Sequence, residues 1–310
     1  MDQRTLTSTD KLILIVGCGY TGLELAQRLT FKGIPVVGST RSVERASVIR
    51  TRGAAVVMMD MSDLSPLKKV RGRLKAIVHM APPIKQEDGS YADHTKDLLE
   101  WAKNEQLERF IYVSSTSVYG SHGGAMVDEH SPCEPDSPRG AKRLEIEKQV
   151  LSADLPSLVV RPAGIYGAGR SMLHRLAAGR YRLVGGGHAF TNRIHVKDLA
   201  ALLEAALVRG EKGSVYLGCD EHPTTQKELV EALIEEFQIP HPPECTLEEA
   251  AIRMPIDVLK MVTGSKRLNS EWTRGSLNVR LRYPDFLSGC RDIWRSEQAS
   301  IRALWGEGKS

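Results

Sequence analysis

Three glycines near the amino terminus have the spacing of a phosphate-binding turn. Gly17, Gly19 and Gly22 form the pattern G-x-G-x-x-G directly after a short apolar run at residues 11–16. The first glycine permits a tight turn, the second lets the backbone approach a pyrophosphate, and the third lets a helix pack closely on the strand. The helix that follows offers free N–H groups to phosphates. The stretch predicts a dinucleotide site; the alternative is a structural turn without a ligand.

The tip of the next predicted strand, at residues 35–41, indicates which dinucleotide fits. A site for NAD usually has an Asp or Glu there, about 20 residues after the glycines, that binds the ribose 2′-hydroxyl. This chain has Thr40 and Arg41 and no carboxylate before Glu44. A guanidinium pairs with a 2′-phosphate, which a carboxylate would repel. The sequence therefore favours NADP(H); the alternative is that Arg41 is an exposed turn residue.

A second polar group follows the predicted strand at residues 109–113. The segment SSTSVYG places Ser115 four positions before Tyr119. The Ser115 hydroxyl either binds a substrate oxygen or only closes the turn at the strand end. Tyr119 is either a substitute proton donor or a packed aromatic that orients the loop. We take both as candidate catalytic residues.

Two arginines further along the chain allow two interpretations each. Arg161 and Arg193 either bind a phosphate of the substrate or support the fold through an ion pair. His195 stands at the entry to a predicted helix, where a structural hydrogen bond is the plainer interpretation.

Strands and helices alternate through most of the chain. We expect strands at residues 11–16, 35–41, 54–59, 74–80, 109–113, 158–160 and 214–217, and helices after Gly22 and at 43–52, 91–105, 141–152, 173–178 and 197–207. Such alternation predicts an α/β fold with a doubly wound parallel sheet and helices on both faces. Ligands of such sheets bind at the carboxyl ends of the strands, where the polar tips lie.

The remaining segments form a loop and a smaller lobe. Residues 121–140 are rich in Gly, Pro, Ser and Asp and predict a long active-site loop. From residue 226 we expect a helix, a proline-rich turn and small mixed elements to the end. We assign residues 11–165 and 191–220 to a dinucleotide-binding domain. Residues 166–190 and 221–310 form the smaller C-terminal substrate lobe.

The composition of the 310-residue chain narrows the function classes. The formal net charge is +4 with scattered Lys and Arg, which does not indicate nucleic acid. Five widely spaced cysteines favour reduced cytoplasmic thiols over disulfides, and nine histidines form no metal-ligand cluster. No apolar run reaches membrane-spanning length. We expect a cytoplasmic protein without a metal, membrane or nucleic-acid partner.

Six segments together resemble the extended short-chain dehydrogenase/reductase family, in its NAD-dependent epimerase/dehydratase group. They are GCGYTG at 17–22, Asp60 after the third strand, HMAPP at 79–83, SSTSVYG at 114–120, RPAGIYG at 161–167 and RIHVKDLA at 193–200. The resemblance implies a Rossmann fold in which Asp60 contacts the adenine and Ala81 and Pro82 line the cofactor trough. It implies that Ser115 takes the place of the catalytic Ser or Thr. It also implies a small-molecule substrate, commonly a sugar nucleotide, and a homodimer formed by the helices near 91–105 and 141–152.

Pattern and resemblance together give one set of predicted cofactor contacts. These residues are Gly17, Gly19, Tyr20, Thr21, Gly22, Thr40, Arg41, Asp60, Met61, Ala81, Pro82, Ser114 and Pro162.

One departure separates this chain from the family it resembles. Members use a Tyr-x-x-x-Lys pair, in which the tyrosine transfers a proton and the lysine lowers its pKa and holds the nicotinamide ribose. The matching positions hold Arg139 and Arg143. Arginine stays protonated at any working pH, so Arg139 cannot act as acid and base. Arg143 can still bind ribose hydroxyls or a phosphate, and we include it among the candidate catalytic residues.

Two functions fit these observations. The first is an NADP(H)-dependent oxidoreductase or epimerase-like enzyme, with Ser115, Tyr119 or water as the proton source. The second is an NADP(H)-binding sensor or scaffold without turnover. The glycine turn and Ser115 favour the enzyme, whereas Arg139 and Arg143 favour the sensor. We favour the enzyme.

Overall fold

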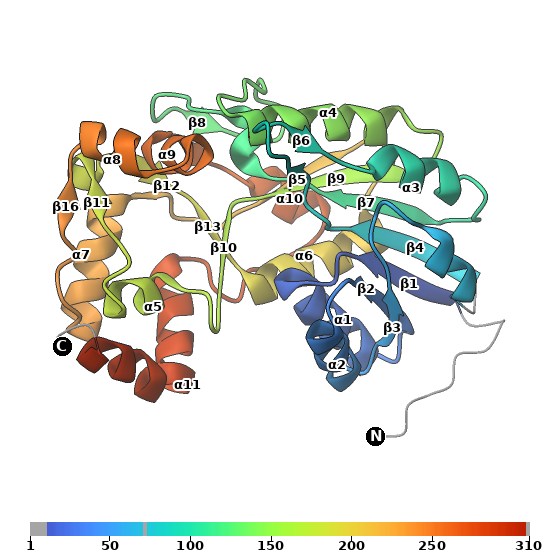
Figure 1. Ribbon diagram of the computed structural model, residues 1–310, viewed down its shortest axis with the longest axis horizontal. Coiled ribbons are helices and arrows are strands. Elements are labelled where there is room, and N and C mark those ends of the chain that lie inside the picture. Colours follow the sequence, from blue (N-terminus) through green and yellow to red (C-terminus); the bar gives the residue numbers. More distant parts are fainter. Residues whose placement is uncertain (1–10, 71–72, 308–310) are drawn as a thin grey trace.

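The computed structural model describes residues 11–70 and 73–307. A seven-stranded sheet, in the order β14-β9-β7-β4-β1-β2-β3, runs through the molecule with every neighbouring pair parallel (Figure 1). Its strands are β1 (Lys11–Val16), β2 (Val36–Thr40), β3 (Ala55–Met58), β4 (Arg73–His79), β7 (Arg109–Val113), β9 (Ser157–Pro162) and β14 (Val215–Gly218). The predicted parallel sheet is confirmed. The strand order reverses between β1 and β4, which is where such sheets bind ligands.

Helices cover both faces of the sheet, as predicted for a doubly wound fold. One face carries α1 (Tyr20–Phe31), α2 (Val43–Thr51) and α6 (Val196–Arg209), and the other carries α3 (Thr95–Ala102) and α4 (Pro138–Ser152) (Figure 1). Along β1, Ile13 and Ile15 point into the core between the sheet and α1, α2 and α6. Leu12, Leu14 and Val16 point into the core on the opposite face, beneath α3 and α4. Burial on both faces explains why β1 is an uninterrupted apolar run.

Two helices begin at other residues than predicted. The helix expected from residue 91 begins at Thr95, because Tyr91–Ala92 form β6, which pairs antiparallel with β5 (Ile84–Lys85). The helix expected from residue 141 begins at Pro138. Ser137 caps it by accepting the Gly140 N–H at 3.2 Å, and proline is favoured at the first helical position.

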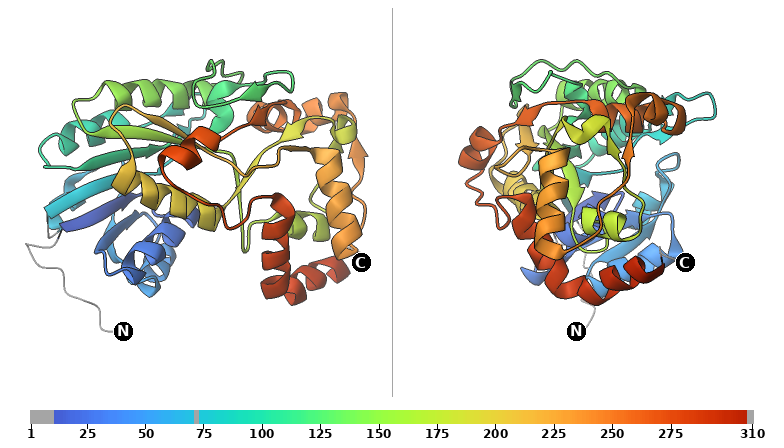
Figure 2. Two further views of the ribbon diagram at one scale, coloured as in Figure 1. Left: turned by 180° about the vertical axis from the view of Figure 1, so that it is seen from behind. Right: turned by 90° about the vertical axis from the view of Figure 1, so that its left-hand side faces the viewer.

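The C-terminal elements gather away from the sheet around a core of their own (Figure 2). Helices α8 (Leu247–Arg253) and α9 (Ile256–Thr263) pack at a small cluster of Val184, Cys245 and Ala250, whereas α5 (Met172–Ala177), α7 (Gln226–Phe237) and α11 (Phe286–Glu307) surround the larger core. Tyr166, Leu233 and Ile293 are among the buried residues of this core. The prediction of small mixed elements to the end was wrong, because α11 is a helix of 22 residues.

Short strand pairs and one helix complete the fold. The pairs are β8 (Met126–Val127) with β17 (Arg267–Leu268), β10 (Gly164–Tyr166) with β13 (Arg193–His195), β11 (Leu183–Val184) with β16 (Glu244–Cys245), and β12 (Phe190–Thr191) with β15 (Thr224–Thr225). Helix α10 (Glu271–Ser276) packs near β14. The predicted domain boundary at residue 165 falls inside β10, and the division into a cofactor domain and a substrate lobe stays a prediction.

Candidate functional site

The three glycines at the junction of β1 and α1 each have a different structural task. Gly17 has a φ of +77°, and a Cβ there would lie 2.7 Å from the Ala81 backbone nitrogen. At Gly22 a Cβ would lie 3.2 Å from the Ile15 side chain, so this glycine lets α1 pack closely on β1. Gly19 faces open space, with its nearest such neighbour 3.9 Å away. The turn therefore has the geometry that lets a pyrophosphate approach the start of a helix.

A pocket of about 390 Å³ lies beside this turn, at the carboxyl ends of β1 to β4. It is lined by most of the predicted cofactor residues, namely Gly17, Gly19, Thr40, Arg41, Asp60, Met61, Ala81 and Pro82. The other predicted contacts lie outside its lining. Tyr20, Thr21 and Gly22 form the first turn of α1, while Ser114 follows β7 and Pro162 ends β9. All of them belong to the same edge of the sheet.

Two arginines and one aspartate determine the charge at the β2 end of the pocket. Arg41 Nη1 lies 3.1 Å from Asp60 Oδ2, and Arg45 of α2 lines the same pocket. Asp60 Oδ1 accepts the Ser62 backbone N–H and hydroxyl, each at 2.9 Å. The Ser62 bonds, with the Arg41 contact, lower the pKa of Asp60 to about 2. Asp60 is therefore a fixed carboxylate, and positive charge remains in excess at this end.

Two serines follow β7 at the sheet edge. Ser115 is half-buried, and its Oγ accepts the Ser117 N–H at 3.2 Å. This bond fixes the oxygen and leaves the hydroxyl hydrogen free to donate. Ser114 is buried, and its hydroxyl has no hydrogen-bond partner within the part of the chain that the structure describes. The half-buried Ser115 hydroxyl is thus available to a ligand, whereas the Ser114 hydroxyl is enclosed by the protein.

Arg143 reaches from α4 to the same strand end. Its Nη1 donates to the Val113 carbonyl at 3.3 Å, while its buried Nε has no partner among the described residues. Burial lowers the pKa of Arg143, yet an arginine remains charged at working pH. The Nε–H is enclosed by the protein, so this buried cation is only partly satisfied by the Val113 carbonyl. Arg139, one turn earlier, is exposed.

Tyr119 lies in a small buried cluster with Val127 and Leu268, separate from the two cores that flank the sheet. It is fully buried, and its hydroxyl accepts from Arg161 Nη1 at 2.9 Å. Burial raises the pKa of Tyr119 to about 12, against the opposing effect of Arg161. This placement favours the packed-aromatic alternative over a proton donor.

Arg161 forms a buried ion pair with Glu147 of α4. Its Nε lies 3.1 Å from both carboxylate oxygens, and its Nη2 lies 2.7 Å from Glu147 Oε2. Arg161 and Glu147 are 6% and 1% exposed. Of the two interpretations that the sequence allowed for Arg161, the structure favours the ion pair that supports the fold.

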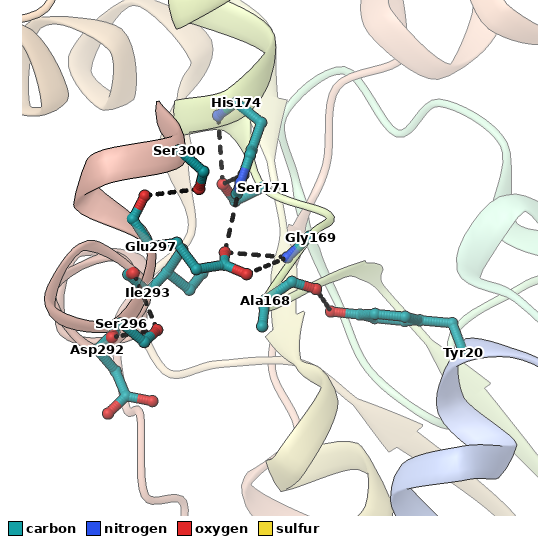
Figure 3. Close-up of polar contacts among 10 residues, drawn as sticks. All are labelled: Tyr20, Ala168, Gly169, Ser171, His174, Asp292, Ile293, Ser296, Glu297 and Ser300. Atoms are coloured by element: carbon teal, nitrogen blue, oxygen red, sulfur yellow. Dashed lines mark hydrogen bonds and ion pairs between the residues drawn. The ribbon is translucent and has the colours of Figure 1, made fainter. Parts of the chain in front are cut away.

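A side-chain contact ties the glycine turn to the C-terminal lobe (Figure 3). The Tyr20 hydroxyl donates to the Ala168 carbonyl at 2.9 Å. Glu297 of α11 holds the same loop by accepting the Gly169 N–H at 3.0 and 3.1 Å, and it lies 3.3 Å from His174 Nε2. Because Tyr20 also belongs to the predicted phosphate turn, this contact links that turn to the loop between β10 and α5.

A further contact joins the lobe to the first turn of α4. The Tyr91 hydroxyl donates to Asp257 Oδ2 at 2.7 Å, and Asp257 Oδ1 accepts the Arg139 N–H at 3.3 Å. Helix α9 therefore rests beside the position where the sequence lacks a tyrosine.

His79 lines the pocket as a buried imidazole. Its Nε2 lies 3.0 Å from Thr95 Oγ1. Burial lowers the pKa of His79 to about 4; Arg143 adds to the shift and Asp93 opposes it. The ring is therefore neutral at pH 7.

Replacing His79 with glutamine should remove one pH-dependent contribution to stability. Below the ordinary pKa of 6.5, the unfolded His79 binds a proton that the folded one does not bind until the pH approaches about 4. The wild type therefore loses stability as the pH falls through this window, by about 1 kcal/mol between pH 7.0 and 5.5. Urea unfolding measures this: the free energy of unfolding of the wild type minus that of His79→Gln should shrink by the same amount when the pH is lowered from about 7.0 to about 5.5. A difference independent of pH would contradict neutral burial.

The predicted cofactor contacts omitted several residues that line the pocket. These are Cys18, Ser39, Ser42, Arg45, Met59, His79, Ile84, Asp93, His94 and Thr95. Arg45 could have been found, because it stands in the first turn of the helix predicted directly after Arg41. Asp93, His94 and Thr95 follow the β5–β6 hairpin, and no local pattern indicates that this hairpin returns to the pocket.

Within residues 11–70 and 73–307, no group of three or more His, Cys, Asp or Glu side chains is arranged to hold a metal ion. No helix in this part of the chain has the length and apolar character needed to cross a membrane. The five cysteines are unpaired.

Comparison with known proteins identifies several relatives. The model of the NAD dependent epimerase/dehydratase family matches residues 13–217. Protein YeeZ of Escherichia coli strain K12 is 28% identical over 225 residues, covering 69% of this chain and 79% of that protein. The dTDP-glucose 4,6-dehydratase of Streptomyces niveus is 25% identical over 258 residues, covering 72% and 76%. The solved structure of a functionally unknown conserved protein from Silicibacter pomeroyi DSS has a TM-score of 0.80 at 28% identity, covering 92% of this chain and 99% of that one.

Proposed function

The chain belongs to the NAD-dependent epimerase/dehydratase family, and from that premise we propose that it is an NADP(H)-dependent oxidoreductase or epimerase-like enzyme acting on a polar small molecule. We favour a sugar nucleotide as the substrate, because the Streptomyces niveus relative is named for one. The observation that carries the proposal is the open glycine turn on the same sheet edge as Ser115, whose hydroxyl hydrogen is free to donate.

The residues at the sheet edge fit the parts of NADP(H) in order. The open backbone at Gly19 and the first turn of α1 suit the pyrophosphate. Arg41 and Arg45 suit a 2′-phosphate, and Arg143, whose guanidinium lies at the β7 end, suits the nicotinamide ribose. When bound, this cofactor supplies or accepts the hydride.

We propose that the substrate oxygen is bound by the residues at the strand ends that do not contact the cofactor. Ser115 Oγ, oriented by the Ser117 N–H, donates to a carbonyl oxygen of the substrate. The Tyr119 hydroxyl is engaged by Arg161 in the core, and Arg139 cannot exchange a proton at working pH. We therefore assign the proton to water, with Ser115 holding the oxygen that receives it.

Removing either pocket arginine should weaken NADPH binding selectively. Each guanidinium that contacts a 2′-phosphate contributes a charge-assisted hydrogen bond, so we expect Arg41→Ala and Arg45→Ala to raise the Kd for NADPH about tenfold. The Kd for NADH should stay within about twofold, since NADH lacks the phosphate. Arg50→Ala, at an exposed arginine of the same helix as Arg45, is the matched control. If the affinities for NADPH and NADH fell equally in these variants, the two arginines would not be contacting the 2′-phosphate.

The exposed Arg139 in place of a tyrosine favours one alternative, an NADP(H) sensor or scaffold without turnover. Monitoring NADPH oxidation at 340 nm with a panel of sugar nucleotides, aldehydes and ketones, and NADP reduction with the matching alcohols, separates the two. Sugar epimerisation without net oxidation is followed by chromatography of the same mixtures. NADPH binding without any of these reactions would favour the sensor.

Two further features belong to the proposal. We place the protein in the cytoplasm, which the five unpaired thiols support. We also propose a homodimer formed by α3 and α4, as the family resemblance implies. Light scattering of the purified chain tests it, since a mass near that of one 34.2 kDa chain would contradict a dimer.

A further inference from the structure

Arg193, the first residue of β13, stands opposite Gly164 of β10. From the sequence, Arg193 and Arg161 could each bind a substrate phosphate or support the fold through an ion pair. In the structure the two arginines have different partners. Arg161 is held by a carboxylate and a hydroxyl. The buried Nε of Arg193 has no hydrogen-bond partner within residues 11–70 and 73–307, and its side chain forms no ion pair with them.

Gly164 makes room for this guanidinium beside the sheet edge. A Cβ at residue 164 would lie 2.7 Å from Arg193 Nη1, so any larger residue would displace it. Gly164 follows β9 by two positions, and β9 pairs with β7, the strand that leads into Ser115. Arg193 therefore lies at the strand end next to the one that carries the proposed substrate-binding serine.

No carboxylate among the described residues forms an ion pair with Arg193. Asp220 is the nearby carboxyl group. Burial raises its pKa and the attraction of Arg193 opposes that shift, but the two side chains form no ion pair among the described residues. Arg175 adds a second positive charge nearby, and the Phe286 ring centre lies 6.0 Å from Arg193 Cζ. An unpaired, desolvated guanidinium lowers stability unless another group compensates it.

We propose that Arg193 binds an anionic group of the substrate, a phosphate or a carboxylate. The inference rests on the proposed function, because it assigns a residue to the substrate of that same site. A planar guanidinium presents two parallel N–H groups that match the oxygens of either anion. The free protein thus keeps a guanidinium without an ion-pair partner among the described residues, and the anionic ligand supplies that partner.

The first test compares unfolding free energies of the purified full chain without added anions. Methionine has a similar length and no charge, so Arg193→Met should leave the urea midpoint unchanged or raise it, because it removes an unpaired charge. Arg161→Met, which breaks a buried ion pair, should lower the midpoint clearly. If Arg193→Met lowers the midpoint as much as Arg161→Met does, Arg193 is structural and the proposal is overturned.

The second test measures anion binding by calorimetry with inorganic pyrophosphate, malonate and UDP-glucose. We expect Arg193→Met to weaken the probe that binds there by about 10- to 100-fold. Arg180→Met, at an exposed arginine that the proposed site does not include, should bind like the wild type. Loss confined to pyrophosphate and UDP-glucose assigns a phosphate, and loss confined to malonate assigns a carboxylate. Equal affinities in wild type and Arg193→Met for all three probes would overturn the proposal.

These readouts are separate from the proposed activity. A protein that binds no NADPH and oxidises no substrate would refute the proposed function, yet the urea midpoint and the anion affinities of Arg193→Met would still decide the role of this residue.

Discussion

Replacing Arg161 with methionine is expected to destabilise the protein by about 3–5 kcal/mol, which is the usual effect of removing one partner of a buried ion pair. Glu147, 1% exposed, would keep a carboxylate with no cation in a low-dielectric core. Tyr119 would also lose the Arg161 donor to its hydroxyl. Equilibrium unfolding in urea at pH 7 measures the loss.

A double variant provides the control for this prediction. In Arg161→Met with Glu147→Leu, the uncompensated carboxylate is gone as well, so most of the lost stability should return. A single variant that loses less than about 1 kcal/mol would contradict the buried pair, since that is the range of exposed pairs. A double variant no more stable than the single one would show that packing of the Arg161 side chain dominates.

Replacing Ser115 with alanine is expected to lower kcat/KM about 100- to 1000-fold for whichever substrate the NADPH assay identifies. This is the usual loss of rate when an enzyme loses one positioned hydrogen-bond donor to the reacting oxygen. The Ser115 hydroxyl caps only a 3-10 turn of four residues, so the unfolding free energy should fall by no more than about 1 kcal/mol. The Kd for NADPH should not change, because the 2′-phosphate and pyrophosphate contacts lie elsewhere.

Tyr119→Phe is the companion variant, because the sequence left Tyr119 as the other candidate donor. The ring stays in the core and only the hydroxyl bonded to Arg161 is removed. We expect kcat/KM to stay within a few-fold of wild type. Unchanged turnover in Ser115→Ala, or a large loss in Tyr119→Phe, would reverse the roles assigned to these two residues.

The features that the sequence predicted well are local ones. The glycine turn, the apolar strand before it and the helix after it are all encoded within residues 11–29, and the structure keeps them together. The parallel sheet followed from alternating strands and helices, since that alternation leaves few topologies open.

The features that the sequence did not reveal depend on distant residues. Helix α11 was missed partly because Gly289 interrupts its pattern, yet this glycine is needed there: a Cβ would lie 2.7 Å from the Tyr166 ring. The contact of Glu297 with Gly169 joins residues 128 positions apart, so no local sequence pattern predicts it. The different fates of Arg161 and Arg193 likewise depended on whether a carboxylate reaches them in the folded chain.

The open glycine turn and the two arginines beside it make cofactor choice the central claim. Separate fluorescence titrations of the wild-type chain with NADPH and NADH, in the same buffer and at the same ionic strength, test it most directly. A phosphate held by Arg41 and Arg45 should make NADPH bind at least about tenfold more tightly than NADH. Equal affinities, or tighter binding of NADH, would contradict the account.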